Sequence, residues 1–425
     1  MFSFLHVADI HLDSPLRGLA RYEGAPVEEI RGATRQALDN LVNYALENAI
    51  SLIVLAGDVY DADCPDFQTL LHFGHQMSRL GEHGVQVVMI RGNHDADNSM
   101  TASLTLPDNV TVLPSAKPGT WRSPSLPVAV HGQSYAGREV ATNLVRDYPS
   151  PVPGLFNIGL LHTALSGRPG HAPYAPCTLT DLAAKGYDYW ALGHVHEFEQ
   201  VAQAPHVVFC GCLQGRHARE TGAKGCVRVD VDDQGQLLVE QVVLDVLRWI
   251  LVDVNISGVR RLDDLYAAVA SALRVALPPL GNRLAAVRLR LQGQCAAHAR
   301  IVQDPDKVIA QIRLLATDLS RHRTWIEKVL LDTTPELDLA VLSQADTPQA
   351  GLLRALKALE QDPDELTALG LDLRDVQARI SGSGLSLPDL DDPKTRSALV
   401  KDVRNMLIPM LAGASGASLE EDHAH

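Results

Sequence analysis

The chain has 425 residues, of which 46% are hydrophobic and 5% aromatic, the composition of an ordinary globular protein. Its length exceeds one typical domain, so we expect two or three domains. The formal net charge of −14 argues against a protein that coats nucleic acid by bulk electrostatics. No apolar run is long enough for a transmembrane helix and the first residues form no basic leader, so a cytoplasmic protein is expected. Six cysteines without a CxxC pair predict free thiols.

Five predicted strands end in residue types that bind metal ions. In chain order these residues are Asp9 and His11 after residues 4–8, Asp58 after 52–57, Asn93 after 85–92, His162 at the end of 157–162, and His194 and His196 after 189–193. Open α/β sheets place ligand-binding residues beyond the carboxyl ends of their strands. In an extended segment, residues i and i+2 face the same way, so Asp-x-His and His-x-His can each aim two ligands at one point. The glycines before Asp58, Asn93 and His194 allow the backbone to approach the site closely.

These seven candidates offer oxygen from three residues and imidazole from four. That is too many ligands for one zinc ion, but it suits two metal ions that share a bridging carboxylate. Two ions about 3.5–4 Å apart are the usual arrangement for phosphoester hydrolysis. A mixed oxygen and imidazole set suits Mn, Fe, Zn, Co or Ni better than Ca or Mg.

The segments between the first strands read as helices over residues 27–48 and 65–83. Asp61 and Asp63 are interpreted as the capped start of the second helix. Arg17 lies in the loop after the first strand, where it either contacts a phosphate backbone or faces solvent.

Three more strands are predicted over residues 206–210, 224–231 and 237–244. The loop over residues 214–224 is the densest basic loop near the predicted site. Two interpretations stand for it: Arg216 and Lys224 bind DNA phosphate, or Arg216 pairs internally with Glu220.

Beyond residue 245 the pattern changes. Strands over residues 250–256, 286–292 and 325–332 alternate with helices over 262–276 and 306–315, which predicts a small α/β cap over residues 246–346. A helical region over residues 347–412 follows, with helices at 352–359, 365–380 and 394–411. Residues 413–425 are small, polar and acidic, hence expected to be disordered.

The last helix carries one apolar stripe at helical spacing, formed by Leu399, Val403, Met406, Leu407, Met410 and Leu411. Pro409 is expected to kink or end this helix. The stripe packs either on the protein's own cap or in a groove of a partner chain.

The five strand-end motifs, in their order, resemble those of the calcineurin-like metallophosphoesterases. Residues 9–15 (DIHLDSP) and 211–225 further resemble the DNA-repair exonuclease branch of that family, the SbcD-like and YhaO-like nucleases. The similarity covers roughly residues 1–245, which would be the catalytic domain. It implies a mixed α/β (α+β) fold, with a β-sandwich flanked by helices that precedes the α/β cap and the C-terminal helices.

The resemblance also implies roles. It assigns one metal ion to Asp9, His11, Asp58 and His196 and a second to Asp58, Asn93, His162 and His194. Both would be divalent, with Mn²⁺ expected. His94 would be the general acid, and Asp95 would orient its ring. The remaining interpretation of His94 is a further ligand or a packing residue.

The function that follows is a two-metal DNA exonuclease, with endonuclease activity allowed, that acts in DNA repair. Its expected partners are DNA, an SbcC-like or YhaN-like coiled-coil ATPase, and a second copy of the chain. The acidic charge balance fits a partner that holds the DNA. The alternative function is a metallophosphatase or cyclic-nucleotide phosphodiesterase, which would use the same metal chemistry.

Overall fold

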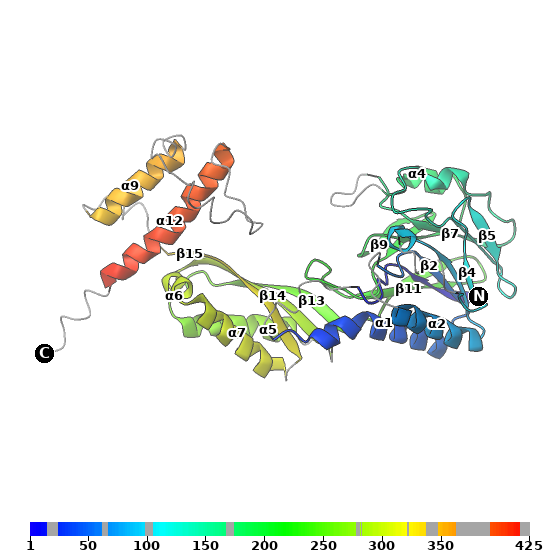
Figure 1. The fold of residues 1–425 in the computed structure, drawn as a ribbon, viewed down its shortest axis with the longest axis horizontal. Coiled ribbons are helices and arrows are strands. Elements are labelled where there is room, and N and C mark those ends of the chain that lie inside the picture. The colour runs from blue at the N-terminus through cyan, green and yellow to red at the C-terminus, as the bar shows by residue number, and fades with distance from the viewer. Residues whose placement is uncertain are drawn as a thin grey trace. The chain divides into compact units, whose positions relative to one another are not determined.

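A computed structural model describes residues 1–14, 24–61, 67–97, 105–166, 174–277, 281, 283–320, 323–336, 347–362 and 392–416. The chain divides into two compact units (Figure 1). Unit 1 consists of Met1–Leu251, Leu277–Arg288 and Ser320–Glu327, and unit 2 of Val252–Ala276, Leu289–Leu319 and Lys328–His425. Among the described residues, none of the helices has both the length and the apolar character needed to cross a membrane.

The first sheet of unit 1 has the strand order β12-β11-β1-β2-β3-β4. Its central strands run parallel from β1 to β4, and β11 joins antiparallel to both β1 and β12. The strands are β1 (Phe2–Val7), β2 (Leu52–Ala56), β3 (Gln86–Ile90), β4 (Val110–Val112), β11 (Gly225–Val231) and β12 (Leu237–Val243).

The second sheet of unit 1 has the order β5-β6-β7-β8-β10-β9. Here β6, β7, β8 and β10 run parallel, and the edge strands β5 and β9 are antiparallel to their neighbours. The strands are β5 (Gly119–Arg122), β6 (Val128–Gly132), β7 (Phe156–His162), β8 (Tyr189–Gly193), β9 (Phe198–Gln203) and β10 (His206–Cys210).

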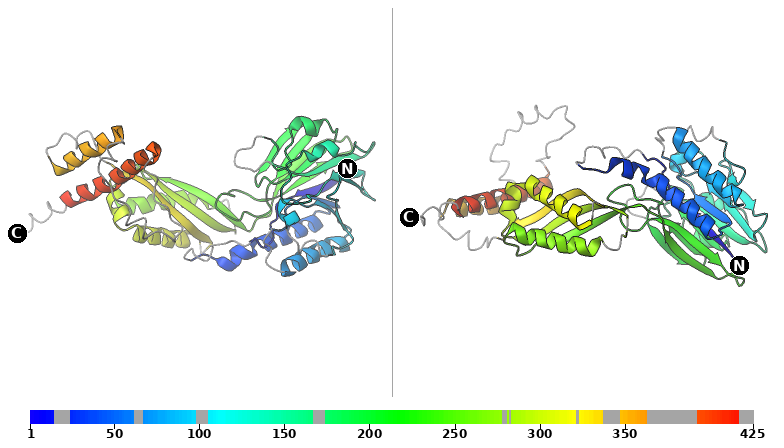
Figure 2. Two further views of the ribbon diagram at one scale, coloured as in Figure 1. Left: turned by 45° about the horizontal axis from the view of Figure 1, so that its top comes forward. Right: turned by 90° about the horizontal axis from the view of Figure 1, so that it is seen from below.

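The two sheets pack face to face around a core that includes Phe4, Val54, Ile158 and Tyr189. Helices α1 (Val27–Glu47) and α2 (Phe67–Glu82) cover the outer face of the first sheet (Figure 2). The short helices η2 (Leu144–Asp147) and α4 (Leu179–Ala183) supply side chains to a third core on the outer face of the second sheet. Unit 1 is therefore a β-sandwich flanked by helices, and the predicted fold class is confirmed.

The residue patterns explain these layers. In β1, Phe4 faces the neighbouring sheet whereas Leu5 and Val7 face the helices, as the two-residue period of a strand requires. In α1, Leu38, Leu41, Val42 and Ala45 recur at three- and four-residue spacing and are buried against the first sheet. The strands are apolar on both faces because both faces are covered.

Unit 2 contains α5 (Leu262–Ala276), α6 (His298–Gln303), α7 (Pro305–Ser320), α9 (Pro348–Gln361) and α12 (Pro393–Gly416). A three-stranded sheet has the order β13-β14-β15, formed by β13 (Leu247–Asn255), β14 (Leu284–Cys295) and β15 (Thr324–Pro335). Helices α5 and α7 lie on one side of this sheet (Figures 1 and 2). Helix α12 contacts both α9 and α6. All the strands and helices predicted for the cap are present in the predicted order, with the short helix α6 added before α7.

Several expectations differ from the structure. Strands β4 and β9 and helix α6 were not predicted, and α12 continues past its predicted end at residue 411 to Gly416, into the segment expected to be disordered. Among the described side chains of α12, Val400 and Arg396 are buried, and Leu399, Val403 and Leu407 of the predicted stripe are half-buried. Met406 of the same stripe is 52% exposed. The predicted helix over residues 365–380 lies outside the described residues, as does Cys64, while the other five cysteines are buried and free.

We predict that Gly159→Ala destabilises unit 1. Gly159 pairs with Trp190 in the adjacent strand, and an added Cβ would lie 2.4 Å from the Trp190 ring. Overpacking of this kind costs about 1–3 kcal/mol of unfolding free energy. The matched control is Gly32→Ala in α1, where the Cβ meets nothing within 4 Å and helix propensity should add about 1 kcal/mol. Urea denaturation of both variants checks this, and equal unfolding free energies would contradict it.

Candidate metal centre

The seven predicted metal ligands follow the carboxyl ends of parallel strands from both sheets of unit 1. Asp9 and His11 follow β1, Asp58 follows β2, Asn93 follows β3, His162 ends β7, and His194 and His196 follow β8. Because the two sheets pack face to face, these strand ends meet at one edge of the sandwich. The structure therefore brings together residues separated by up to 187 positions in the chain.

Asp58 and His162 form the centre of one group. His162 Nε2 lies 3.4 Å from Asp58 Oδ2 and 3.0 Å from Asn93 Oδ1. His11 Nε2 lies 3.9 Å from the same Asp58 oxygen. Both Asp58 and His162 are buried.

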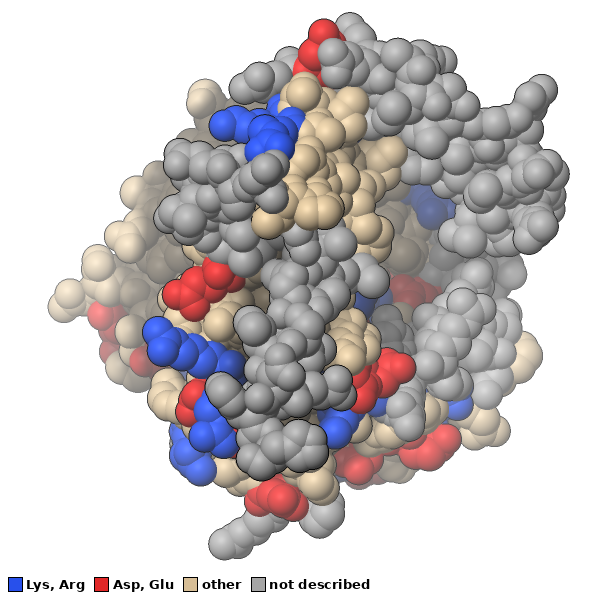
Figure 3. Space-filling model, turned by 90° about the vertical axis from the view of Figure 1, so that its left-hand side faces the viewer, with Lys and Arg blue, Asp and Glu red and all other residues tan. Residues whose placement is uncertain are grey.

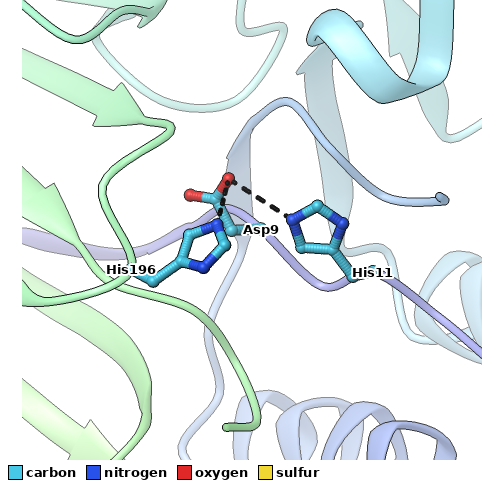
Figure 4. Close-up of side chains that lie close together, drawn as sticks. All are labelled: Asp9, His11 and His196. Atoms are coloured by element: carbon cyan, nitrogen blue, oxygen red, sulfur yellow. Dashed lines mark ion pairs between the residues drawn. The ribbon is translucent and has the colours of Figure 1, made fainter. Parts of the chain in front are cut away.

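Asp9 is the centre of a second group, in which two imidazole rings point at one carboxylate (Figure 4). Asp9 Oδ1 lies 3.6 Å from His196 Nε2 and 4.0 Å from His11 Nε2. Within the described part of the chain, neither Asp9 Oδ1 nor His11 Nε2 has a hydrogen-bond partner, although both atoms are buried. Buried polar atoms are normally paired. Distances too long for a hydrogen bond between converging donor atoms fit a shared cation, so these residues suit a bound divalent ion.

His194 joins the cluster through its backbone and its ring. Its backbone N–H donates to Asp9 Oδ2 at 2.9 Å, and its ring lies edge-on to His162 with the centroids 5.2 Å apart. The ring of Tyr174 also lies edge-on to His194, with the centroids 5.3 Å apart. All seven predicted ligands thus lie in one continuous cluster, and their role as ligands stays a prediction.

The backbone at this edge is strained. Asp9, His11, Asp58 and His194 all have positive φ, from 44° to 96°, a region that residues other than glycine rarely adopt. Such conformations cost about 1–3 kcal/mol each and cluster at functional sites. The glycines allow close approach as expected: a Cβ on Gly92 would lie 2.2 Å from Asp58 Oδ1.

Outer hydrogen bonds fix how three rings point. Asp61 Oδ1 accepts from His11 Nδ1 at 2.7 Å, Glu220 Oε1 from His196 Nδ1 at 2.6 Å, and the Ala56 carbonyl from His162 Nδ1 at 2.9 Å. Each ring is left with Nε2 facing the carboxylate cluster. The sequence interpretation of Asp61 as a helix start missed this contact. A carboxylate three residues after Asp58, in the same loop, was the available signal.

The pKa values report strong negative charge at the site. Burial opposes protonation of His162, but the Asp58 carboxylate outweighs it and raises the pKa of His162 to about 9. Burial likewise opposes protonation of His196, and the Asp9 and Glu220 carboxylates outweigh it and raise its pKa to about 9. Burial would raise the pKa of Asp58, yet His162 and His11 hold it well below its usual range. A potential that favours protons on buried imidazoles also attracts divalent cations.

His94 borders the cluster, with its side chain 35% exposed. Its backbone N–H donates to Asp58 Oδ1 at 3.0 Å, and its Nδ1 lies 3.4 Å from Asp61 Oδ1. Asp95 accepts instead from the backbone N–H groups of Gly92, Val59 and Tyr60. Burial, with the charge of Asp58, raises the pKa of Asp95 to about 6. Asp61 thus lies within reach of the His94 ring, and the orienting role expected for Asp95 stays a prediction.

The predicted DNA contacts do not form an exposed basic surface. Lys224 is 4% exposed, and its Nζ donates to the His196 carbonyl at 2.8 Å. The Arg216 side chain is 13% exposed and pairs with Glu220, which supports the internal-pairing interpretation of the loop. Arg17 lies outside the described residues.

Comparison with known families defines the class of enzyme. The profile of calcineurin-like phosphoesterases matches residues 2–198, and that of the metallophosphoesterase YhaO middle domain matches residues 249–334. The first range contains all seven candidate ligands. The protein is therefore a metallophosphoesterase hydrolase, a class whose members use a dimetal centre.

Individual relatives support the same classification. The chain is 34% identical over 299 residues to the uncharacterized metallophosphoesterase YhaO of Bacillus subtilis (strain 168), covering 68% of this chain and 72% of that protein. It is 26% identical over 207 residues to the DNA double-strand break repair protein Mre11 of Methanopyrus kandleri, covering 45% and 44%. It is 34% identical over 104 residues to a subunit of the nuclease SbcCD of B. subtilis, covering 24% of each. The chain belongs to the calcineurin-like metallophosphoesterases, as the motifs predicted.

We predict that Asp58→Ala removes bound metal and all hydrolysis. Asp58 lies within 4 Å of both His11 and His162, so both ions would lose a ligand. Metal content measured by mass spectrometry on purified protein, together with phosphodiesterase activity, checks this. Asp263→Ala, which removes an exposed carboxylate, is the control and should retain both. Near-normal turnover with two ions still bound would show that Asp58 is not the bridging residue.

Proposed function

We propose that this protein is a two-metal-dependent nuclease that hydrolyses DNA phosphodiester bonds, as an exonuclease with possible cleavage inside strands, in DNA repair. The observation that carries the proposal is the cluster around Asp9 and Asp58, in which buried and unpaired ligand atoms converge. In the proposed assignment, Asp9, His11, Asp58 and His196 hold one ion, and Asp58, Asn93, His162 and His194 hold the other.

Divalent ions bound there would supply Lewis-acid charge to the phosphoryl oxygens and lower the pKa of a water nucleophile. The chain's own residues position these ions. The Nδ1 hydrogen bonds of His11, His162 and His196 fix the ring orientation, and burial excludes competing water. The mixed oxygen and imidazole ligands suit Mn, Fe, Zn, Co or Ni, and of these we infer Mn²⁺ as the working ion because the family resemblance implies it.

His94 is the proposed general acid. Its partly exposed ring stands next to Asp58 and Asp61, where it can reach a leaving oxygen without being enclosed by the cluster. Asp61 holds its Nδ1 side, which leaves Nε2 free to deliver a proton.

The DNA substrate is supported by the relatives, not by surface charge. One relative is named as a DNA double-strand break repair protein and another as part of a nuclease. On the face drawn in Figure 3, basic and acidic side chains lie interspersed, and the net charge is −14. An acidic nuclease gains from a partner that holds the DNA. The second candidate is a phosphatase or cyclic-nucleotide phosphodiesterase, which would use the same cluster.

One assay separates these functions. Purified protein with Mn²⁺ is given double-stranded DNA, single-stranded DNA and a small generic phosphodiester, bis(p-nitrophenyl) phosphate. We expect cleavage of DNA, and its products also give the strand polarity. Hydrolysis of the small ester with both DNAs left intact would overturn the nuclease proposal and favour the second candidate.

We predict that His94→Gln separates binding from chemistry. The variant should keep its metal content and DNA affinity while losing roughly 10²–10⁴ in rate, the usual scale of acid–base catalysis. Metal analysis, DNA binding and single-turnover cleavage measure the three quantities. A fall in metal content would instead make His94 a ligand. His75→Gln, an exposed histidine on α2, is the control.

We further propose the domain division predicted above, with a catalytic domain over residues 1–245, a cap over 246–346 and a C-terminal region over 347–412. The range of the matched YhaO middle domain supports the cap.

A partner ATPase of the SbcC-like or YhaN-like coiled-coil type would dock on the C-terminal region, and a homodimer of the nuclease would complete the complex. Because α12 packs on α9 and α6, the surface left for docking includes the exposed Met406.

We predict that Met406→Glu abolishes co-purification with that ATPase while metal-dependent cleavage of short DNA survives. A charge at an exposed apolar position disrupts a hydrophobic contact without disturbing the buried Val400. Removal of residues 347–425 should have the same effect. Lys401→Glu, at an exposed polar position of α12, is the control. If the truncated protein unfolds or loses hydrolysis, these helices belong to its own core and the docking proposal fails.

A further inference from the structure

Arg216 lies between the two carboxylates that hold the outer nitrogens of His11 and His196. Its Nη1 is 3.5 Å from Asp61 Oδ1, and its Nη2 donates to Glu220 Oε1 at 3.1 Å. Its own backbone N–H donates to the second Glu220 oxygen at 2.6 Å. Nη1 also lies 3.4 Å from Ser14 Oγ, in the loop that follows His11. One guanidinium thus contacts three loops, those that carry Ser14, Asp61 and Glu220.

The two histidines have matching geometry. Asp61 accepts from His11 Nδ1 and Glu220 accepts from His196 Nδ1, so each ring turns Nε2 toward Asp9 Oδ1, at 4.0 and 3.6 Å. A neutral imidazole has one N–H, and a hydrogen bond donated from Nδ1 leaves the Nε2 lone pair for a metal ion. The position and charge of the two carboxylates therefore decide whether these rings can act as ligands.

The surroundings of Asp61 and Glu220 are electrostatically unfavourable for carboxylate ions. Asp61 and Glu220 are 8% and 5% exposed and share the region with the buried Asp9 and Asp58. Burial raises the free energy of a carboxylate ion, and each further negative charge adds repulsion. The Arg216 cation, between Asp61 and Glu220, offsets both costs. A guanidinium presents its donors in a rigid planar fork that can contact two carboxylates at fixed positions, whereas an ammonium group is a compact point charge with rotatable donors.

We propose that Arg216 is a positioning residue of the metal centre. It holds Asp61 and Glu220 in place, and through them it aims His11 Nε2 and His196 Nε2 at one divalent cation. The inference rests on the proposed metal centre and adds Arg216, Asp61 and Glu220 to it as residues that position the ligands. It replaces the phosphate contact that the basic loop suggested for Arg216.

The burial of the side chain favours this role over a phosphate contact. Arg216 is 13% exposed and directs its terminal nitrogens at Asp61, Ser14 and Glu220, whereas Arg219, three residues further on the same loop, is exposed. A residue that grips a DNA backbone must reach solvent-exposed phosphate. Arg219 is therefore the matched control.

The test is binding of Mn²⁺ alone to the full chain, measured by isothermal titration calorimetry on wild type, Arg216→Gln, Arg216→Lys and Arg219→Gln. Losing an outer hydrogen-bond partner of a metal site costs about 10–100-fold in affinity. We expect a loss of that size for Arg216→Gln, a smaller loss for Arg216→Lys, which keeps the charge but not the fork, and none for Arg219→Gln. Circular dichroism checks folding, and if the Gln variant does not fold, the Lys variant alone decides.

A double-mutant cycle between Arg216 and Glu220 gives a second measurement. If Arg216 acts through Glu220, the effects of Arg216→Gln and Glu220→Gln on Mn²⁺ affinity are not additive in the double variant. Mn²⁺ binding equal to wild type in Arg216→Gln, with weaker DNA binding and a shallower salt dependence, would overturn the proposal and make Arg216 a phosphate contact. Failure of wild type to bind Mn²⁺ would instead refute the metal centre itself. Failure to cleave DNA while Mn²⁺ binds would refute only the nuclease proposal.

Discussion

The constraint on which unit 1 depends is the buried negative charge of Asp9 and Asp58. Two carboxylates without solvent access are stable only if cations or hydrogen-bond donors surround them. Backbone N–H groups of His94 and His194 supply part of this, donating to Asp58 and Asp9. Asp58 Oδ2 lies 3.4 Å from His162 Nε2, whereas Asp9 Oδ1 faces two imidazole nitrogens at 3.6 and 4.0 Å and has no hydrogen-bond partner among the described residues. The buried carboxylates are therefore stabilised further by any positive charge placed between these groups, and divalent ions would supply it.

The sandwich is built so that both sheets contribute to this edge. His6 lies between the sheets, where its ring nitrogens are 3.0 Å from the Tyr189 hydroxyl and 3.2 Å from the Leu192 carbonyl. Burial lowers the pKa of His6 to about 3, so the ring stays neutral and can donate to one group and accept from the other. This links β1 to β8, the strands that lead to Asp9 and to His194. A rigid link directly behind the site fixes the distance between ligands that come from opposite sheets.

Much of the fold of unit 1 and of the candidate site was predictable from the sequence, because strands that end in Asp, Asn or His are visible in the linear pattern. The ligand cluster, α1, α2 and the strands that lead to the candidate ligands follow from that pattern and from apolar spacing. The partners of the ligands do not, because Glu220 meets His196, and Asp61 meets His11, only through folding. The positive φ of Asp9 and His194 is equally invisible in a sequence. In α12, spacing predicted an apolar stripe but not which side α9 would cover, and Val400 is buried rather than Met406.

The acidic residues around the candidate metal centre make different contacts. Asp95 accepts from backbone N–H groups, whereas Asp61 contacts side chains of several site residues. Asp95 receives three backbone N–H groups and so holds the loops after β2 and β3 together. Asp61 lies 2.7 Å from His11 Nδ1 and 3.4 Å from His94 Nδ1, and Arg216 approaches the same oxygen. One carboxylate therefore contacts both a proposed metal ligand and the proposed general acid. On the proposed assignment, a change at His94 would alter proton transfer alone, whereas a change at Asp61 would alter metal binding and proton transfer at once.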